Sequence, residues 1–90
     1  MISPFPSASE GAMPGARMLD RAEGILVGLR RYPVATAFDE IVSVSQRHVV
    51  PPLRVASALV ELAEGRESSD PDATEVAIEQ WGDLLRVAQR

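Results

Sequence analysis

The sequence predicts an all-α protein, a three-helix bundle with an additional C-terminal amphipathic helix. Apolar residues recur at three- and four-residue steps in four separate segments, which is the spacing of one face of a helix. Proline and glycine interrupt the pattern between these segments, where helices begin and end. A chain of 90 residues supports one domain at most, and so small a core often gains stability by dimerising or by docking on a partner.

The first helix is expected from Ala16 to about Arg30. Residues 1–15 hold three prolines, two glycines and three serines without apolar periodicity, so we predict a disordered arm there. Gly24 and Gly28 lie four positions apart inside the helix, and each costs about 1 kcal/mol of helix propensity relative to alanine. We therefore expect another helix to approach closely at these glycines; the alternative is that the helix simply tolerates them.

Two further helices are expected on either side of a proline-containing turn. The second runs from near Val34 to about Arg47 or His48, and the third runs from Pro52 to Glu64. Pro52 fits the first helical turn, and Gly65 fits the position just past the helix end. Because the third helix is apolar on more than one side, we expect two neighbours to cover it.

A fourth helix is expected from about Asp72 to Gln89, after a turn-rich connector. Pro71 fits its first turn, and Glu75 lies near the positive end of the helix dipole. Trp81 on its apolar face is interpreted as a packing anchor, against either the core or a second subunit. The predicted division of the chain is a disordered arm over 1–15, a three-helix domain over 16–66, and an acidic linker with the C-terminal helix over 67–90.

The formal net charge of −4 is carried by the C-terminal part of the chain. Residues 17–66 hold seven arginines and six acidic residues, whereas residues 67–90 hold six acidic residues and two arginines. Binding of nucleic acid by the middle of the chain is therefore compatible with an acidic protein.

Several classes of function are excluded by what the sequence lacks. With no cysteine and one histidine, we expect no disulfide, no metal site and no cofactor. No nucleophile–base pair and no glycine-rich phosphate loop is found, so we expect neither an enzyme nor a small-molecule substrate. No long apolar run and no signal peptide is found, which predicts a cytoplasmic protein that does not enter a membrane.

Short motifs in the first three helices resemble the ANTAR family of bacterial RNA-binding antitermination domains. In chain order they are Arg21–Leu26, Ala37–Phe38, Ser45–Arg47, Val55–Ala56 and Leu59–Val60. The resemblance covers roughly residues 17–64 and implies a three-helix, ANTAR-like bundle. It also implies a dimer that binds paired hexaloop hairpins in leader RNA and so prevents a transcription terminator from forming.

The chain departs from the family pattern at two places. Glu23 stands where the family usually has lysine, and residues 49–54 carry valines and prolines where the family has a polar residue and cations. No receiver or GAF sequence precedes the domain, so we expect the signal to come from a partner or from the abundance of the chain. A sensor-bearing relative that forms a heterodimer with this chain is one such partner.

Arginine suits RNA loops because its guanidinium group can stack on splayed bases, bond to their edges and neutralise phosphate. In an up-down-up bundle, the start of the first helix lies near the turn between the second and third helices. Ser45 and Gln46 match the family motif beside this turn. We call the predicted RNA surface the corner cluster, which consists of Arg17, Arg21, Ser45, Gln46, Arg47, His48 and Arg54. The alternatives are a solvated surface without a ligand and, for His48, a contact with the helix dipole.

The leading hypothesis is a stand-alone RNA-binding regulator of transcription termination that acts as a homodimer. The residues predicted to form the dimer contact are Leu19, Leu26, Leu29 and Trp81. A second hypothesis is a helical dimerisation or docking module that has lost RNA binding. A third is a helix-turn-helix DNA-binding protein, which the two prolines and the apolar start of the third helix disfavour.

Overall fold

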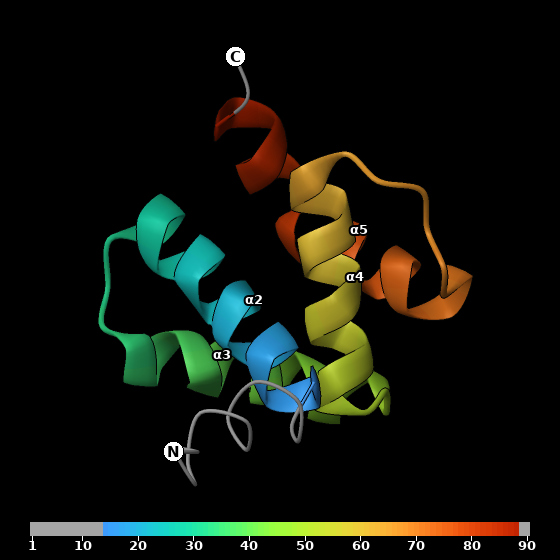
Figure 1. Ribbon diagram of the computed structural model, residues 1–90, viewed down its shortest axis with the longest axis horizontal. Coiled ribbons are helices and arrows are strands. Elements are labelled where there is room, and N and C mark those ends of the chain that lie inside the picture. The colour runs from blue at the N-terminus through green and yellow to red at the C-terminus, as the bar shows by residue number, and fades with distance from the viewer. Residues whose placement is uncertain (1–13, 89–90) are drawn as a thin grey trace, which may run out of the picture.

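The computed structural model describes residues 14–88, which form four α-helices (Figure 1). They are α2 (Pro14–Arg30), α3 (Val34–His48), α4 (Pro52–Glu64) and α5 (Pro71–Ala88). The described residues include no strand, so the predicted all-α class is confirmed. Pro14 and Gly15 belong to α2, whereas the arm was predicted to include them. The rest of the predicted arm, residues 1–13, lies outside the described residues.

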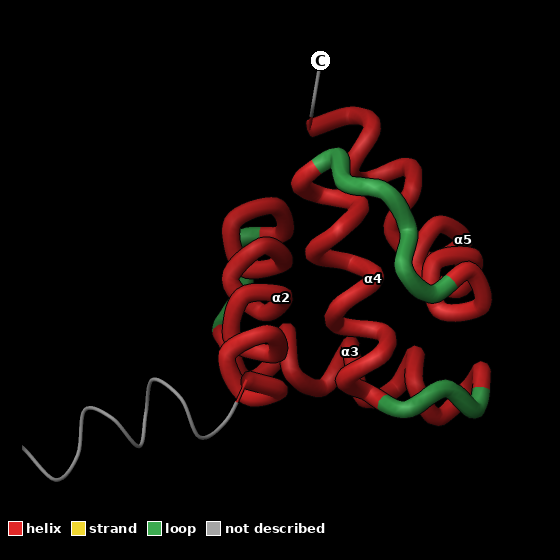
Figure 2. Tube along the Cα trace, turned by 45° about the vertical axis from the view of Figure 1, so that its right-hand side comes forward, coloured by secondary structure: helices red, strands yellow, loops and turns green. Residues whose placement is uncertain are grey.

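Helix α4 lies in the middle, with α2 on one side and α5 on the other (Figures 1 and 2). Helix α3 crosses the lower end of the bundle in both views. A side chain added at Gly15 would meet Leu53 at 2.7 Å, so the first turns of α2 and α4 lie together. Ile25 and Leu29 lie beside Ala63 farther along, so the two helices run in the same direction. The start of α2 is therefore near the α3–α4 turn, as expected for an up-down-up arrangement.

All four helices contribute to one core. Helix α4 buries Val55, Leu59 and Val60 because α2 and α5 cover it from two sides, as predicted. Trp81 brings α5 into the same core. The largest side chains without exposed surface are Leu26, Ile41, Val44, Val55, Leu59, Val60 and Trp81.

Three of the described helices are followed by a residue in the left-handed conformation, and the first of these residues is Arg31, with a φ angle of 61° after α2. Gly65 has a φ angle of 71° after α4, as expected for a glycine past a helix end. Val49 has a φ angle of 56° after α3, a conformation that β-branched residues rarely adopt. The side chain of Val49 is 87% exposed, so no packing offsets this strain.

The close helix approach predicted at Gly24 and Gly28 is wrong. Both glycines are exposed, and no atom of a neighbouring element lies within 4 Å of the position that a Cβ would occupy. They line an open groove between α2, α4 and α5.

Candidate nucleic-acid interface

Ser45 closes the α3–α4 turn. Its hydroxyl donates a 2.5 Å hydrogen bond to the carbonyl oxygen of Val50, and its carbonyl oxygen accepts one from the Val50 N–H at 3.0 Å. The residue is 6% exposed. The prediction that Ser45 contacts RNA is therefore wrong, because its polar atoms are used to satisfy the end of α3.

Gln46 and His48 lie next to this turn. Gln46 is exposed and lines, with Val49 and Pro51, a shallow depression of about 370 Å³. His48 is the last residue of α3 and is half-buried. This position puts the imidazole of His48 at the negative end of the helix dipole.

Arg47 and Arg54 lie on either side of the turn, and both bind the C-terminal segment, residues 67–88. Nη2 of Arg47 donates to Oε1 of Gln80 at 3.1 Å, and this amide is a neutral partner. Arg54 donates to both carboxylate oxygens of Asp70, at 2.5 and 2.8 Å. These hydrogen bonds raise the pKa of Arg54 and lower the pKa of Asp70 to about 2.

The two arginines of α2 occupy a different surface. Arg17 and Arg21 lie on the exposed face of this helix. Arg21 is 3.8 Å from Glu64, which also pairs with Arg66 at 2.9 Å. Glu64 is the last residue of α4, whereas Arg54 is in the first turn of the same helix. The two residues are about 15 Å apart along the helix axis. The corner cluster is therefore divided, because Arg21 reaches toward the far end of α4.

The ion pairs of the corner cluster lie at the surface. The side chains of Arg21 and Arg54 are 57% and 46% exposed in their pairs. Ion pairs in contact with water are weak and are screened by salt. The phosphates of a polyanion can therefore compete with Glu64 and Asp70 for these two guanidinium groups.

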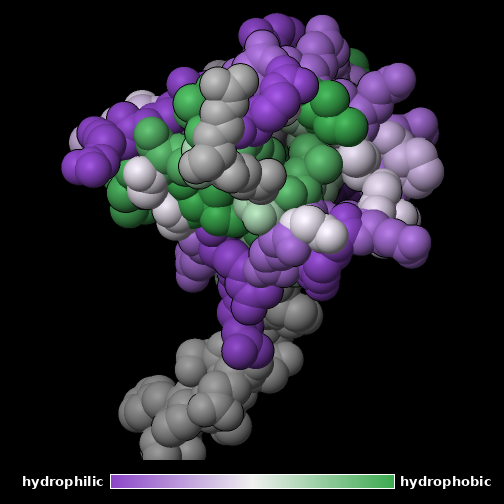
Figure 3. Space-filling model, turned by 90° about the horizontal axis from the view of Figure 1, so that it is seen from above, coloured by the Kyte–Doolittle hydropathy of each residue, from purple (hydrophilic) through white to green (hydrophobic). Residues whose placement is uncertain are grey.

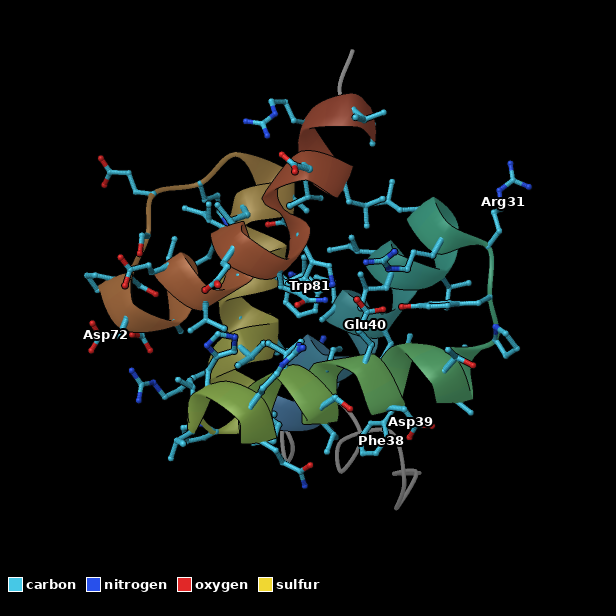
Figure 4. All side chains as sticks on the ribbon, turned by 180° about the vertical axis from the view of Figure 1, so that it is seen from behind. Arg31, Phe38, Asp39, Glu40, Asp72 and Trp81 are labelled. Atoms are coloured by element: carbon cyan, nitrogen blue, oxygen red, sulfur yellow. The ribbon has the colours of Figure 1, made fainter. Side chains whose placement is uncertain are left out.

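A polar cluster that the sequence analysis missed is centred on Glu40 of α3. Its carboxylate accepts hydrogen bonds from Nε1 of Trp81 at 2.7 Å and from the hydroxyl of Tyr32 at 2.5 Å. It also accepts from Arg30 at 3.0 Å and from Gln80 at 3.3 Å. Glu40 and Trp81 lie side by side in the middle of the molecule (Figure 4). The cluster joins α3 to the end of α2 and to α5.

Burial and hydrogen bonding have opposite effects on Glu40. Burial alone would raise its pKa, but the hydrogen bonds from Tyr32 and Trp81 outweigh burial and lower the pKa. Burial and the bond to Glu40 both raise the pKa of Tyr32. Because Gln80 bonds to both Glu40 and Arg47, the cluster also fixes the candidate interface relative to α5.

Glu23, the residue that departs from the family pattern, is 8% exposed. Burial, and then the charge of Asp20, raises its pKa. Glu23 follows Arg21 by two residues, so it lies on a different side of α2 from the exposed arginines. Its carboxylate is therefore not part of the arginine-bearing face.

The residues predicted to form a dimer contact are divided between the core and the surface. Leu26 and Trp81 have no exposed surface, so their prediction as dimer contacts is wrong. Both side chains are buried in the core of a single chain. Leu19 and Leu29 are partly buried against this core, and Leu29 also lines the groove between α2, α4 and α5.

The fold and this surface define a small all-α protein with exposed arginines around a helix–helix turn. Comparisons with family models, with curated proteins and with solved structures found no match. The resemblance to the ANTAR family therefore depends on the sequence motifs alone and stays a prediction. Within residues 14–88, no helix combines the length and the apolar character that crossing a membrane requires.

Proposed function

We propose that this chain is an RNA-binding regulator of transcription termination that binds leader-RNA hairpins as a dimer. The observation that carries the proposal is the position of Arg47 and Arg54, two exposed guanidinium groups on either side of the α3–α4 turn. Arg17 is at the same end of the bundle, because the first turns of α2 and α4 lie together. The sequence motifs supply the second line of support.

The side chains around the turn suit an RNA loop better than a regular duplex. Guanidinium groups can stack on unpaired bases while they neutralise phosphate, and the amide of Gln46 can both donate to and accept from a base edge. The exposed side chain of Val49 offers an apolar contact to a base that has left the stack. A duplex would instead require an element that follows its groove.

The test is binding of a fluorescently labelled hairpin RNA over a series of salt concentrations. We expect the affinity to fall steeply with salt, because phosphate contacts release counterions. Arg47→Ala and Arg54→Ala should each weaken binding by about tenfold. Arg86→Ala is the matched control, since it removes the same exposed group from α5, where Arg86 pairs with Asp83.

Absence of binding at low salt overturns the proposal. So does an affinity that neither Arg47→Ala nor Arg54→Ala changes. An equal loss in Arg86→Ala would assign the binding to overall charge, and this too counts against a specific surface.

A second candidate is a helical docking module without RNA binding, which is favoured by the open apolar groove between α2, α4 and α5. Light scattering and pull-down in the absence of RNA separate this candidate from the first. The helix-turn-helix alternative is disfavoured, because α4 would be the recognition helix and is covered by α2 and α5.

A further inference from the structure

An open apolar groove of about 440 Å³ lies between α2, α4 and α5. Gly24 and Gly28 leave the backbone of α2 accessible there, because no neighbouring element comes within 4 Å of their Cβ positions. Seen from above, hydrophobic residues form a patch that hydrophilic residues surround (Figure 3). The groove is lined by Gly24, Ile25, Gly28, Leu29, Ala63, Leu85 and Ala88.

Arginines lie at both ends of the glycine pair. Arg21, Gly24 and Gly28 follow one another at steps of three and four residues and share the exposed face of α2, and Arg31 is the exposed residue directly after the end of this helix. Arg21 is 3.8 Å from Glu64, whereas the side chain of Arg31 has no hydrogen bond or ion pair to any residue between 14 and 88. Arg31 points away from the molecule (Figure 4). This face of α2 therefore attracts acidic groups to the edge of the groove.

The outward face of α5 carries the complementary chemistry. Glu75 and Glu79 are exposed, and neither pairs with a cation in the described part of the chain. Ile78 lies between them in the sequence, and its side chain is 52% exposed. The three residues share the outward half of the helix. They present an aliphatic side chain with two carboxylates beside it, one turn of the helix apart.

These two surfaces do not meet within one molecule. The groove is already lined by Leu85 and Ala88, from the last turns of the same α5. Arg31 and Asp72, which is in the first turn of α5, lie on opposite sides of the molecule (Figure 4). The acidic face that complements the groove must therefore come from another chain.

We infer that the groove binds the outward face of α5 from a second copy of this chain. Ile78 of the second copy lies over Gly24 and Gly28, and the neighbouring carboxylates of the same helix lie beside Arg21 and Arg31. Between Arg21 and its last residue, Arg30, α2 rises about 14 Å, and Arg31 follows directly, which leaves room for a crossing helix about 10 Å in diameter. The missing side chains at the glycines allow the two helix backbones to approach closely.

Charge favours this pairing over symmetric alternatives. Contact between the α2 faces of two copies would bring Arg21 and Arg31 against the same arginines, and contact between two α5 faces would oppose Glu75 and Glu79 to themselves. The groove and the α5 face are different surfaces, so one contact leaves a free groove on one copy and a free α5 face on the other. Association can therefore continue beyond two copies. None of this depends on RNA binding.

The test is the molar mass of the full chain without RNA, measured by sedimentation equilibrium at about 0.01 to 1 mM. We expect the average mass to rise with concentration and to fall when salt is added. Arg21→Glu/Arg31→Glu changes the groove, and Glu75→Arg/Glu79→Arg changes the α5 face. Each double variant should weaken self-association by about tenfold or more, and an equimolar mixture should restore it, because each variant keeps the surface that the other has lost.

The matched control is Asp39→Arg/Glu67→Arg, which reverses two exposed acidic residues outside both surfaces. Asp39 points away from the molecule on α3 (Figure 4). This variant should associate as the wild type does, and circular dichroism shows whether each variant is folded. A monomer mass at every concentration overturns the inference, as does an equal loss in the control. A dimer that neither double variant weakens overturns it as well, because its contact lies elsewhere.

Discussion

The indole Nε1 of Trp81 donates a 2.7 Å hydrogen bond to the carboxylate of Glu40, 41 residues earlier in the chain. This bond connects α5 to α3 and satisfies a donor on a side chain without exposed surface. Arg30, the last residue of α2, and Tyr32, in the connection that follows, donate to the same carboxylate. One acidic side chain therefore determines how three helices fit together.

Replacement of Glu40 by alanine should strongly destabilise the protein. The change leaves the donors of Trp81 and Tyr32 without an acceptor, and we expect the free energy of unfolding to fall by about 2 to 4 kcal/mol. Urea denaturation followed by tryptophan fluorescence measures the change. Asp39→Ala removes the neighbouring exposed acid and should change stability by less than about 0.5 kcal/mol. Equal losses in the two variants would contradict the role of the cluster.

Stability should fall in acid because the pKa of Glu40 is lowered in the folded state. The folded state then binds the proton less readily than the unfolded state, so the contribution of Glu40 is complete above its ordinary pKa of 4.5 and is lost as the pH falls through the lowered value. Urea denaturation at pH 7, 4 and 3 measures the loss. The same series on Glu40→Gln should show a smaller decrease, and parallel decreases in both proteins would refute the assignment.

Replacement of Val49 by glycine should stabilise the protein. Val49 has a φ angle of 56°, which glycine adopts without strain, and its exposed side chain contributes no packing. We expect an increase of about 1 kcal/mol in the free energy of unfolding, seen as a higher melting temperature. Gly65→Ala is the converse control, because a φ angle of 71° disfavours alanine. A decrease in Val49→Gly would mean that the side chain has an unrecognised role.

The helix bounds could be predicted because the signals that set them are local. Pro52 fixes the start of α4 through its own backbone geometry, and Gly65 fixes its end in the same way. The position of α4 between two neighbouring helices could also be predicted, because its apolar residues occupy more than one side of the helix. Val49 shows the limit of this reasoning, because nothing in its side chain predicts a left-handed residue at the end of α3.

The partners of the candidate site residues could not be predicted, because they depend on the register between distant segments. Arg54 meets Asp70, sixteen residues later, and Glu40 meets Trp81 across the core. A buried indole implies an acceptor somewhere, but the sequence does not say which acid supplies it. Ser45 was assigned to RNA from its motif, whereas the fold uses its hydroxyl to close the turn.

Replacement of Asp70 by asparagine should increase RNA affinity if the proposed function holds. The change removes the charge that holds Arg54, while an asparagine can still accept the hydrogen bond from the N–H of Ala73 that starts α5. We expect hairpin RNA to bind about two- to fivefold more tightly, with little change in melting temperature. Asp83→Asn, at an exposed site that pairs with Arg86, is the control for net charge. Equal gains in the two variants would show that Asp70 has no specific effect.

Replacement of Gly24 and Gly28 by alanine should raise the stability of the single chain and weaken its self-association. Because both Cβ positions are open, each alanine should add about 1 kcal/mol of helix propensity without a clash, and the melting temperature should rise. The same methyl groups would stand between α2 and a helix that docks on it, so self-association should weaken several-fold. Calorimetry and sedimentation on the double variant measure the two effects. Higher stability with unchanged association would show that the glycines do not admit a second helix. Lower stability would instead contradict the open environment of the two glycines.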